Sequence, residues 1–295
     1  MFNVAPVAAI WLAWFFVAAN VVGTKFATPY VASTLFMLLS CSVAAVCFVP
    51  YLVKTGGWKT LLAKNIWPQC LLMATFGTAL PMTFFMLALN YTTPANAAIL
   101  NQFEIVYSLI LAYFLLGEKP TGKQIGGSLL IVLGVGVLLW QSGISVQLKG
   151  DLLILGTLWM FQVSHIFAKK LPKDMPPALI AAARAIFAIP VLAVFCAVLF
   201  TVQGPLLFTP TWVLWATLGF SAICNYFIGN TFWYTAIRNM DLGKATAIIL
   251  SYPVMTFILS VLLGQDTVNT YKVLGLILAL SGAYVVTGII KGDKK

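Results

Sequence analysis

Glu104 is the only charged residue in an apolar stretch that runs from residue 94 to residue 116. Asn101 and Tyr107 lie three residues to either side, which places all three side chains on one face of a helix. If this helix crosses a bilayer, an acid near its centre costs roughly 2.5–3.5 kcal/mol on insertion scales, so Glu104 should face a cavity. There it could bind a cation, pair with a base or carry a proton for coupled transport. The alternative is a neutral side chain that donates a hydrogen bond to a neighbouring helix.

A second group of candidates comes from a spacing that occurs twice. A tryptophan, a polar residue and a lysine recur in the two halves of the chain with an identical spacing: Trp14, Asn20 and Lys25, then Trp159, His165 and Lys170. Polar residues related in this way should meet near the axis of an internal repeat, where substrate sites of transporters lie. His165, the single histidine, could titrate near neutral pH. Its alternative role is a hydrogen bond between helices.

Three further polar residues stand inside apolar stretches. Arg184 could clamp a substrate carboxylate with its planar guanidinium. Its stretch begins near residue 177, however, so we favour a structural role in which the side chain reaches the headgroups. Asn225 and Asn230 share another stretch, and at least one of them should face the cavity because an amide is costly in lipid.

Aromatic side chains supply the remaining candidates for substrate contact, since ligand sites are mostly apolar with a few well-placed polar atoms. These candidates are Trp14, Phe84, Trp159, Trp233 and Tyr252. Pro81 and Pro253 lie inside predicted spans, where each removes a backbone donor and permits a bend. We therefore expect these two prolines to act as hinges.

The composition indicates a protein whose solvent is a bilayer. The mean hydropathy is +0.99, with 61% hydrophobic and 8% charged residues, well outside the range of soluble domains. The net charge of +10 comes from scattered basic residues, which argues against nucleic-acid binding because no basic stripe is formed. The five cysteines lie in apolar stretches without a CxxC pair, so we expect buried side chains and no metal or other cofactor.

Stretches of about 20 residues are needed to cross the hydrocarbon. Charged, glycine and proline residues divide the chain into ten: 5–24, 30–53, 66–89, 94–116, 122–141, 151–169, 177–200, 211–236, 243–264 and 271–290. With both termini in the cytoplasm, only Lys25, Lys149 and Lys272 fall on the outer side and Arg184 within a span. All other basic residues lie inside, as the positive-inside rule requires.

The recurring spacing predicts two repeats of five spans each, over residues 1–143 and 144–295. Since five is odd, the two halves must enter the membrane from opposite sides, which makes the repeat inverted. Glycines seven residues apart also recur near the end of each half: Gly127 and Gly134, then Gly275 and Gly282. They should line helix faces that pack closely together.

Several of these motifs together resemble the EamA-type family of the drug/metabolite transporter superfamily. The resemblance rests on Asn20 and Lys25, on the run from Glu104 to Leu116-Gly117-Glu118, on Gln124, Gly127 and Gly134, and on Gly150-Asp151 and Arg184 in the second half. It implies ten helices, a central cavity lined mainly by helices 1, 3, 4, 6, 8 and 9, and export or exchange of small metabolites. It also implies the inner (plasma) membrane of a bacterium.

We therefore expect a secondary transporter of amino acids, amines or aromatic compounds, working by alternating access with Glu104 as the coupling candidate. The chain has no GxxxxGK[ST] motif, so an ion or solute gradient should supply the energy. An importer of a charged, cofactor-like metabolite is the alternative. A membrane-embedded enzyme is more remote, because no HExxH or GxSxG motif is present. We expect a monomer, with a dimer as the alternative.

Overall fold

The computed structural model describes residues 5–116, 120–142, 146–169, 171–172, 174–239, 248–249 and 251–286. These residues are mainly helical and include one isolated β-bridge, between Val31 and Phe208. The helices of the first half are α1 (Pro6–Ala27), α2 (Ser33–Thr55), α3 (Gly57–Leu61), α4 (Trp67–Ala74), α5 (Leu80–Ala88), α6 (Pro94–Leu100), α7 (Glu104–Leu116) and α8 (Gly122–Ser142). Those of the second half are α9 (Val146–Lys169), α10 (Pro177–Gln203), α11 (Trp212–Gly219), α12 (Asn230–Asn239), α14 (Tyr252–Leu262) and α15 (Thr270–Val286).

Three segments of non-α geometry interrupt these helices. A π-helix, η1 (Thr75–Ala79), joins α4 to α5, and a second, η3 (Phe220–Gly229), joins α11 to α12. A 3-10 turn, η2 (Asn101–Phe103), joins α6 to α7. Wide π turns are rare and are found mostly at functional sites, so these interruptions mark the places to look for one.

Within the described chain, six helical segments are long and apolar enough to cross a membrane: Pro6–Ala27, Ser33–Thr55, Trp67–Ala88, Gly122–Trp140, Pro177–Gln203 and Trp212–Ala236. Two shorter apolar helices, α14 and α15, accompany them. Each of the ten predicted ranges contains at least one described helix. The number of ten spans, their orientation and the inverted relation of the halves stay predictions.

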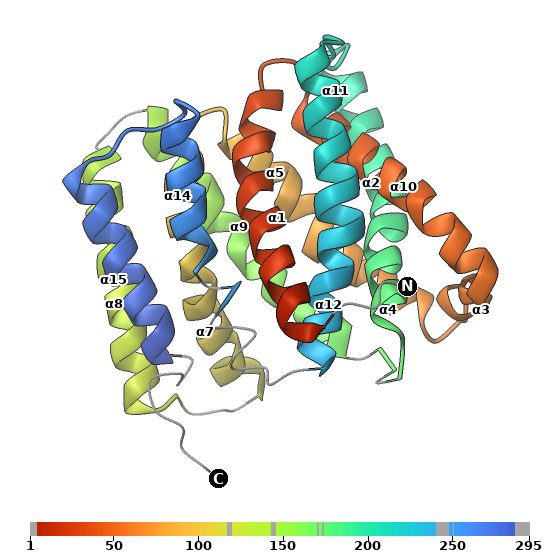
Figure 1. Ribbon diagram of the computed structural model, residues 1–295, viewed down its shortest axis with the longest axis horizontal. Helices are drawn as coiled ribbons and strands as arrows, with labels where there is room; N and C mark the ends of the chain where they lie inside the picture. The colour runs from red at the N-terminus through yellow and green to blue at the C-terminus, as the bar shows by residue number, and fades with distance from the viewer. Residues whose placement is uncertain are drawn as a thin grey trace.

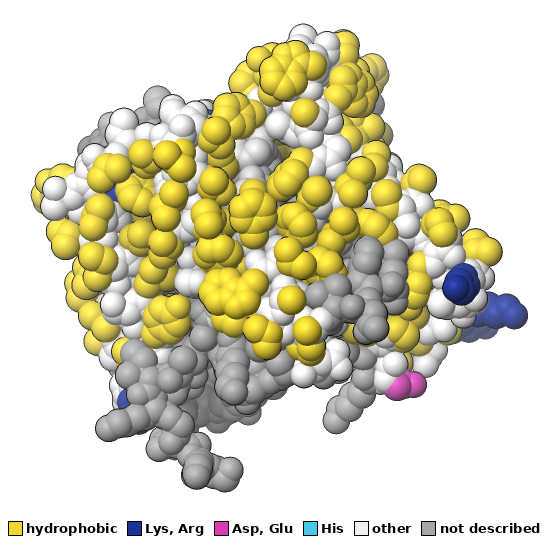
Figure 2. Space-filling model, in the orientation of Figure 1, with side chains coloured by type: hydrophobic (Ala, Val, Ile, Leu, Met, Phe, Trp, Pro, Cys, Tyr) yellow, Lys and Arg dark blue, Asp and Glu magenta, His cyan; other side chains and the backbone are white. Residues whose placement is uncertain are grey.

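The outer surface of the helices is apolar. On the face in Figure 2, hydrophobic side chains spread across the helices and the visible charged side chains lie near the margins. Large side chains such as Trp140, Trp212 and Phe114 are 79%, 80% and 75% exposed. A surface of this kind is stable against lipid tails and would drive aggregation in water, which agrees with an integral membrane protein.

The interior is built from elements of both halves. One buried cluster, which includes Phe36, Phe48 and Leu192, joins α2 and α4 to α10 and α11. A second, which includes Leu100, Ile131 and Leu158, joins α6, α8 and α9 and extends to α14 and α15. Figure 1 shows the consequence, since helices from the two ends of the chain alternate across the bundle. Neither half therefore has a core of its own.

Helices α8 and α15 lie side by side (Figure 1), and glycines form their contact. A Cβ built on Gly127 would lie 2.7 Å from the backbone oxygen of Gly282, and one on Gly275 would lie 3.0 Å from that of Gly134. No side chain fits at these positions without moving a backbone. The prediction that these glycines permit close helix packing is confirmed.

This packing makes a stability prediction. Gly127→Ala should lower the free energy of unfolding by about 1–3 kcal/mol, because overpacking a close contact forces backbone shifts. Gly136→Ala, in the same helix, is the matched control, since a Cβ there meets no atom within 4 Å. Thermal unfolding of the purified proteins in detergent measures both. Equal melting temperatures for the two variants would contradict the proposed role of the glycine contact.

Candidate functional site

A cavity of about 240 Å³ lies at the meeting point of α1, α5, α7, α9, α10, α12 and α14. Six of the residues predicted from the sequence line it: Asn20, Asn101, Glu104, Asn230, Trp233 and Tyr252. Asn225 lines it as well, so both asparagines of that stretch face inward. Aromatic side chains such as Phe85 and Phe161 supply apolar wall. The cavity is smaller than the ~300–1,000 Å³ that hold drug-sized ligands, which suits a small metabolite.

Glu104 lies where a membrane-length helix is broken. Helix α6 ends at Leu100, the 3-10 turn η2 follows, and Glu104 is the first residue of α7. Its Oε1 accepts a hydrogen bond from Nε2 of Gln162 on α9, at 2.8 Å. Sequence reasoning missed Gln162, although an amide in an apolar helix is a recognisable signal. A 3-10 stretch inside a helix often marks a functional hinge, and Glu104 directly follows one.

Asn101 belongs to the same break. Its Nδ2 donates a hydrogen bond to the hydroxyl oxygen of Tyr252, at 2.8 Å. Tyr252 begins α14 in the second half, so the pair ties two helix ends together across the cavity. Trp14 reaches the same place, because its Nε1 donates to Oγ of Ser251 at 3.0 Å. Trp14 therefore fixes α1 against the start of α14 and does not itself line the cavity.

Arg184 also lines the cavity, and the expectation that it reaches the headgroups is wrong. Its Nη2 donates to the backbone oxygen of Gly77 at 2.5 Å, Nε donates to Oγ1 of Thr78 at 3.2 Å, and Nη1 donates to the hydroxyl of Tyr234 at 3.3 Å. The side chain turns inward because these acceptors lie in the bundle interior. The sequence indicates how far Arg184 lies along its membrane-spanning stretch, but not in which direction its side chain points.

The acceptor at Gly77 depends on the π-helix η1. A Cβ on Gly77 would lie 3.0 Å from Nη2 of Arg184 and would overlap Oγ of Ser164. Ser164 itself donates to the backbone oxygen of Met73 at 2.8 Å. A glycine in a wide turn thus lets the guanidinium and a serine hydroxyl approach the backbone together.

The two proposed hinges lie at helix junctions. Pro81 is buried in the first turn of α5, directly after η1, and Pro253 is buried in the first turn of α14. The missing N–H of a proline costs little in a first helical turn. Their action as hinges remains a proposal.

Three other candidates, Phe84, Tyr107 and Trp159, do not line the cavity. Phe84 packs edge-on against Phe195, with ring centroids 6.2 Å apart. Tyr107 packs against Phe103 at 5.5 Å. Trp159 is 38% exposed. The side chain of His165 lies outside the described residues.

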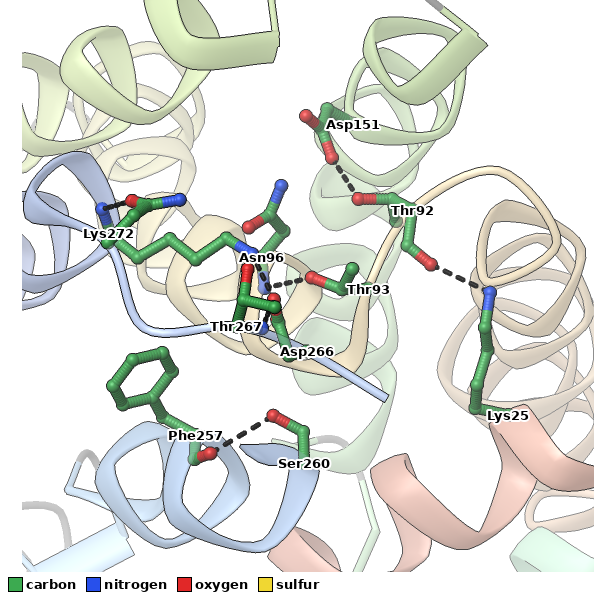
Figure 3. A network of polar contacts seen from close by, with 11 residues as sticks. Lys25, Thr92, Thr93, Asn96, Asp151, Phe257, Ser260, Asp266, Thr267 and Lys272 are labelled. Carbon is green, nitrogen blue, oxygen red and sulfur yellow. Dashed lines mark hydrogen bonds and ion pairs between the residues drawn. The ribbon is translucent and has the colours of Figure 1, made fainter. Parts of the chain in front are cut away.

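Beyond the cavity, a network of polar contacts ties α1 and α9 to the connection between α5 and α6 (Figure 3). Lys25, in the last turn of α1, donates to the backbone oxygens of Leu89 and Thr92 in the connection between α5 and α6. Thr92 Oγ1 donates to the buried carboxylate of Asp151 on α9 at 2.5 Å. Lys25 therefore turns towards backbone oxygens of the protein.

An ion pair in the second half belongs to the same end of the molecule. Lys272 of α15 pairs with Asp266, and their side chains are 4% and 1% exposed. The backbone N–H of Thr267 donates to the same carboxylate at 2.7 Å. Gln265 links this connection to α1, because its Nε2 donates to the oxygen of Val22 at 3.1 Å.

Comparison with known proteins agrees with this architecture. The profile of the EamA-like transporter family matches the chain twice, over residues 5–140 and 148–288. The chain belongs to the EamA-like transporter family. It is accordingly an integral membrane transporter, and not an enzyme.

Relatives of this EamA-like chain are also named transporters. An uncharacterized transporter of Bacillus subtilis, YyaM, is 23% identical over 256 residues, which cover 85% of this chain and 83% of the relative. A probable amino-acid metabolite efflux pump of Escherichia coli is 26% identical over 212 residues, 68% of this chain and 70% of the pump. A solved crystal structure aligns over 96% of both chains with a TM-score of 0.65 at 19% identity, a likeness that shows the fold alone.

The buried ion pair makes a second stability prediction for this EamA-like protein. Lys272→Met should lower the free energy of unfolding by about 3–5 kcal/mol, because it leaves the carboxylate of Asp266 buried without its cation. Adding Asp266→Asn should recover part of the loss. Thermal unfolding in detergent measures each variant, with Lys149→Met as a control at an exposed lysine. A loss equal to that of the control would show that the pair does not hold this end together.

Proposed function

We propose that this protein is a secondary transporter, an exporter or exchanger, that carries small organic metabolites through the 240 Å³ cavity. The single observation that carries the proposal is the position of Glu104, an acid at a helix break that lines a cavity shared by both halves of the chain. The size of the cavity and its mixture of amides, aromatic rings and two charged groups suit amino acids, amines and aromatic compounds. The name of the Escherichia coli relative supports the first of these classes.

Alternating access follows from the inverted arrangement of residues 1–143 and 144–295 that we propose. Ten spans with both termini in the cytoplasm of a bacterium would place the contacts of Lys25 and Lys272 at the outer side. Lys25 and Thr92 join α1 to α9 through the connection between α5 and α6. Lys272 holds the connection before α15 through Asp266, and Gln265 of that connection donates to Val22 of α1. Opening to the outer side would require these contacts to separate, which makes this network the outer gate.

Reconstitution tests the function directly. Purified protein in liposomes should accumulate labelled amino acids, amines or aromatic acids without ATP, and a pH gradient should stimulate the accumulation. Glu104→Gln should reduce accumulation to the level seen without a gradient, because an amide cannot take up and release the coupled proton. Asp174→Asn, at an exposed carboxylate outside the cavity, is the control. If Glu104→Gln keeps the full pH stimulation, the coupling role of Glu104 is wrong.

The gate has its own test. In a cysteine-free background with Thr24→Cys as a probe in the cavity wall, Lys25→Met should raise labelling by an impermeant maleimide severalfold. The reagent is applied from the side on which α1 ends, and removal of the lysine favours opening there. Lys149→Met is the matched control, because Lys149 lies at the same end over the ring of Tyr91, 4.6 Å from its centroid. Equal labelling of the two variants would argue against a gate at Lys25.

A further inference from the structure

Arg184 brings a positive charge to the cavity wall, and its hydrogen-bond partners among the described residues are neutral. Its three acceptors are a backbone oxygen and two hydroxyls, from Gly77, Thr78 and Tyr234. The described residues include no ion-pair partner for its guanidinium. A half-buried cation whose partners are neutral is not neutralised by them. It attracts a ligand anion, because an isolated charge in a low-dielectric site is costly until an anion joins it.

The geometry of the group suits a carboxylate. A guanidinium carries five N–H donors in a planar fork, and the three contacts with Gly77, Thr78 and Tyr234 use one donor from each nitrogen. Both Nη atoms therefore have a second N–H. Arginine binds planar anions through such paired donors, and these charge-assisted bonds are stronger than neutral ones.

Other residues of the cavity wall carry acidic or hydrogen-bond-accepting groups. Glu104 lines it, and the buried amide oxygens of Asn20 and Asn101 have no hydrogen-bond partner among the described residues. Oxygen acceptors of this kind need a donor such as an ammonium or hydroxyl group. The cavity wall thus provides a cation at Arg184 and oxygen acceptors on other residues.

We propose that Arg184 is the carboxylate-binding and specificity-determining residue of this transporter, and that its substrates are monocarboxylates bearing an ammonium or hydroxyl donor. The inference rests on the proposed transport function and narrows it, because it excludes simple amines. A dicarboxylate is excluded as well, since its second charge would meet the acidic and acceptor groups of the wall.

The π-helix η1 positions the guanidinium of Arg184. Because a Cβ on Gly77 would press on Nη2 of Arg184 and on Ser164, Gly77→Ala should move the charge while retaining it. Gly77 is therefore a positioning residue. The variant should weaken recognition of the carboxylate without removing the positive charge from the cavity.

The decisive experiment uses the unaltered protein in liposomes and matched probes. L-threonine, L-leucine and L-phenylalanine are each compared with their amides and with the corresponding decarboxylated amines. Loss of a charge-assisted contact should weaken transport of the amides and amines roughly tenfold or more. Transport of amides or amines as well as the acids would overturn the role of Arg184 and leave the transport function standing. Transport of none of these probes would count against the proposed function itself.

Variants then assign the effect to Arg184. Arg184→Gln should bring the acid-to-amide ratio close to one, and Arg184→Lys should leave an intermediate ratio, because it keeps the charge without the fork. Gly77→Ala should lower the ratio too. If Arg184 served only to hold η1, these variants would reduce the amount of folded protein while the ratio for the surviving protein stayed unchanged, and that result would overturn the proposal.

Discussion

Backbone polar groups in the interior of a bilayer must find partners inside the protein, and this constraint governs the architecture described above. Lipid offers no hydrogen bonds, so a helix can be interrupted only where protein groups or a cavity replace the lost contacts. The chain is interrupted at η1, η2 and η3. Residues of η2 and η3 line the cavity, and the oxygen of Gly77 in η1 receives a donor from Arg184, which lines it too. The breaks and the binding site therefore depend on each other.

Arg184 illustrates how one side chain meets two needs. Its donors satisfy a backbone oxygen that the wide turn releases and two hydroxyls that lie beside it. Partial burial of this charge without a counterion opposes folding, and its hydrogen-bond partners among the described residues are neutral. A substrate carboxylate would remove that cost at the moment of binding.

The two halves contribute different chemistry to the same frame. In the predicted repeat, an offset of 147 residues (251 − 104) pairs Glu104 with Ser251, which accepts a hydrogen bond from Trp14 and donates one to the oxygen of Ile248 at 2.7 Å. An offset of 144 residues (184 − 40) pairs Arg184 with Ser40, which is fully buried in α2. In each pair one member carries charge into the cavity and the other member is a small hydroxyl. A solute in this cavity would therefore meet different polar groups from the two halves of the chain.

The sequence by itself determined the membrane class, the family, the apolar stretches and the two glycine-lined helix faces that pack closely. These properties follow from composition and spacing, which local chain geometry translates directly into helix faces. It also identified six of the residues that line the cavity. The polar members of this set stood out because a polar side chain in a stretch long enough to span the membrane is costly in lipid. The tertiary structure alone decided that Arg184 and Lys25 turn inward, that Gln162 meets Glu104, and that Trp14 and Phe84 pack outside the cavity. Those outcomes depend on which helix lies opposite each side chain. Contacts between residues far apart in the chain produce no local sequence pattern, so the sequence does not predict them.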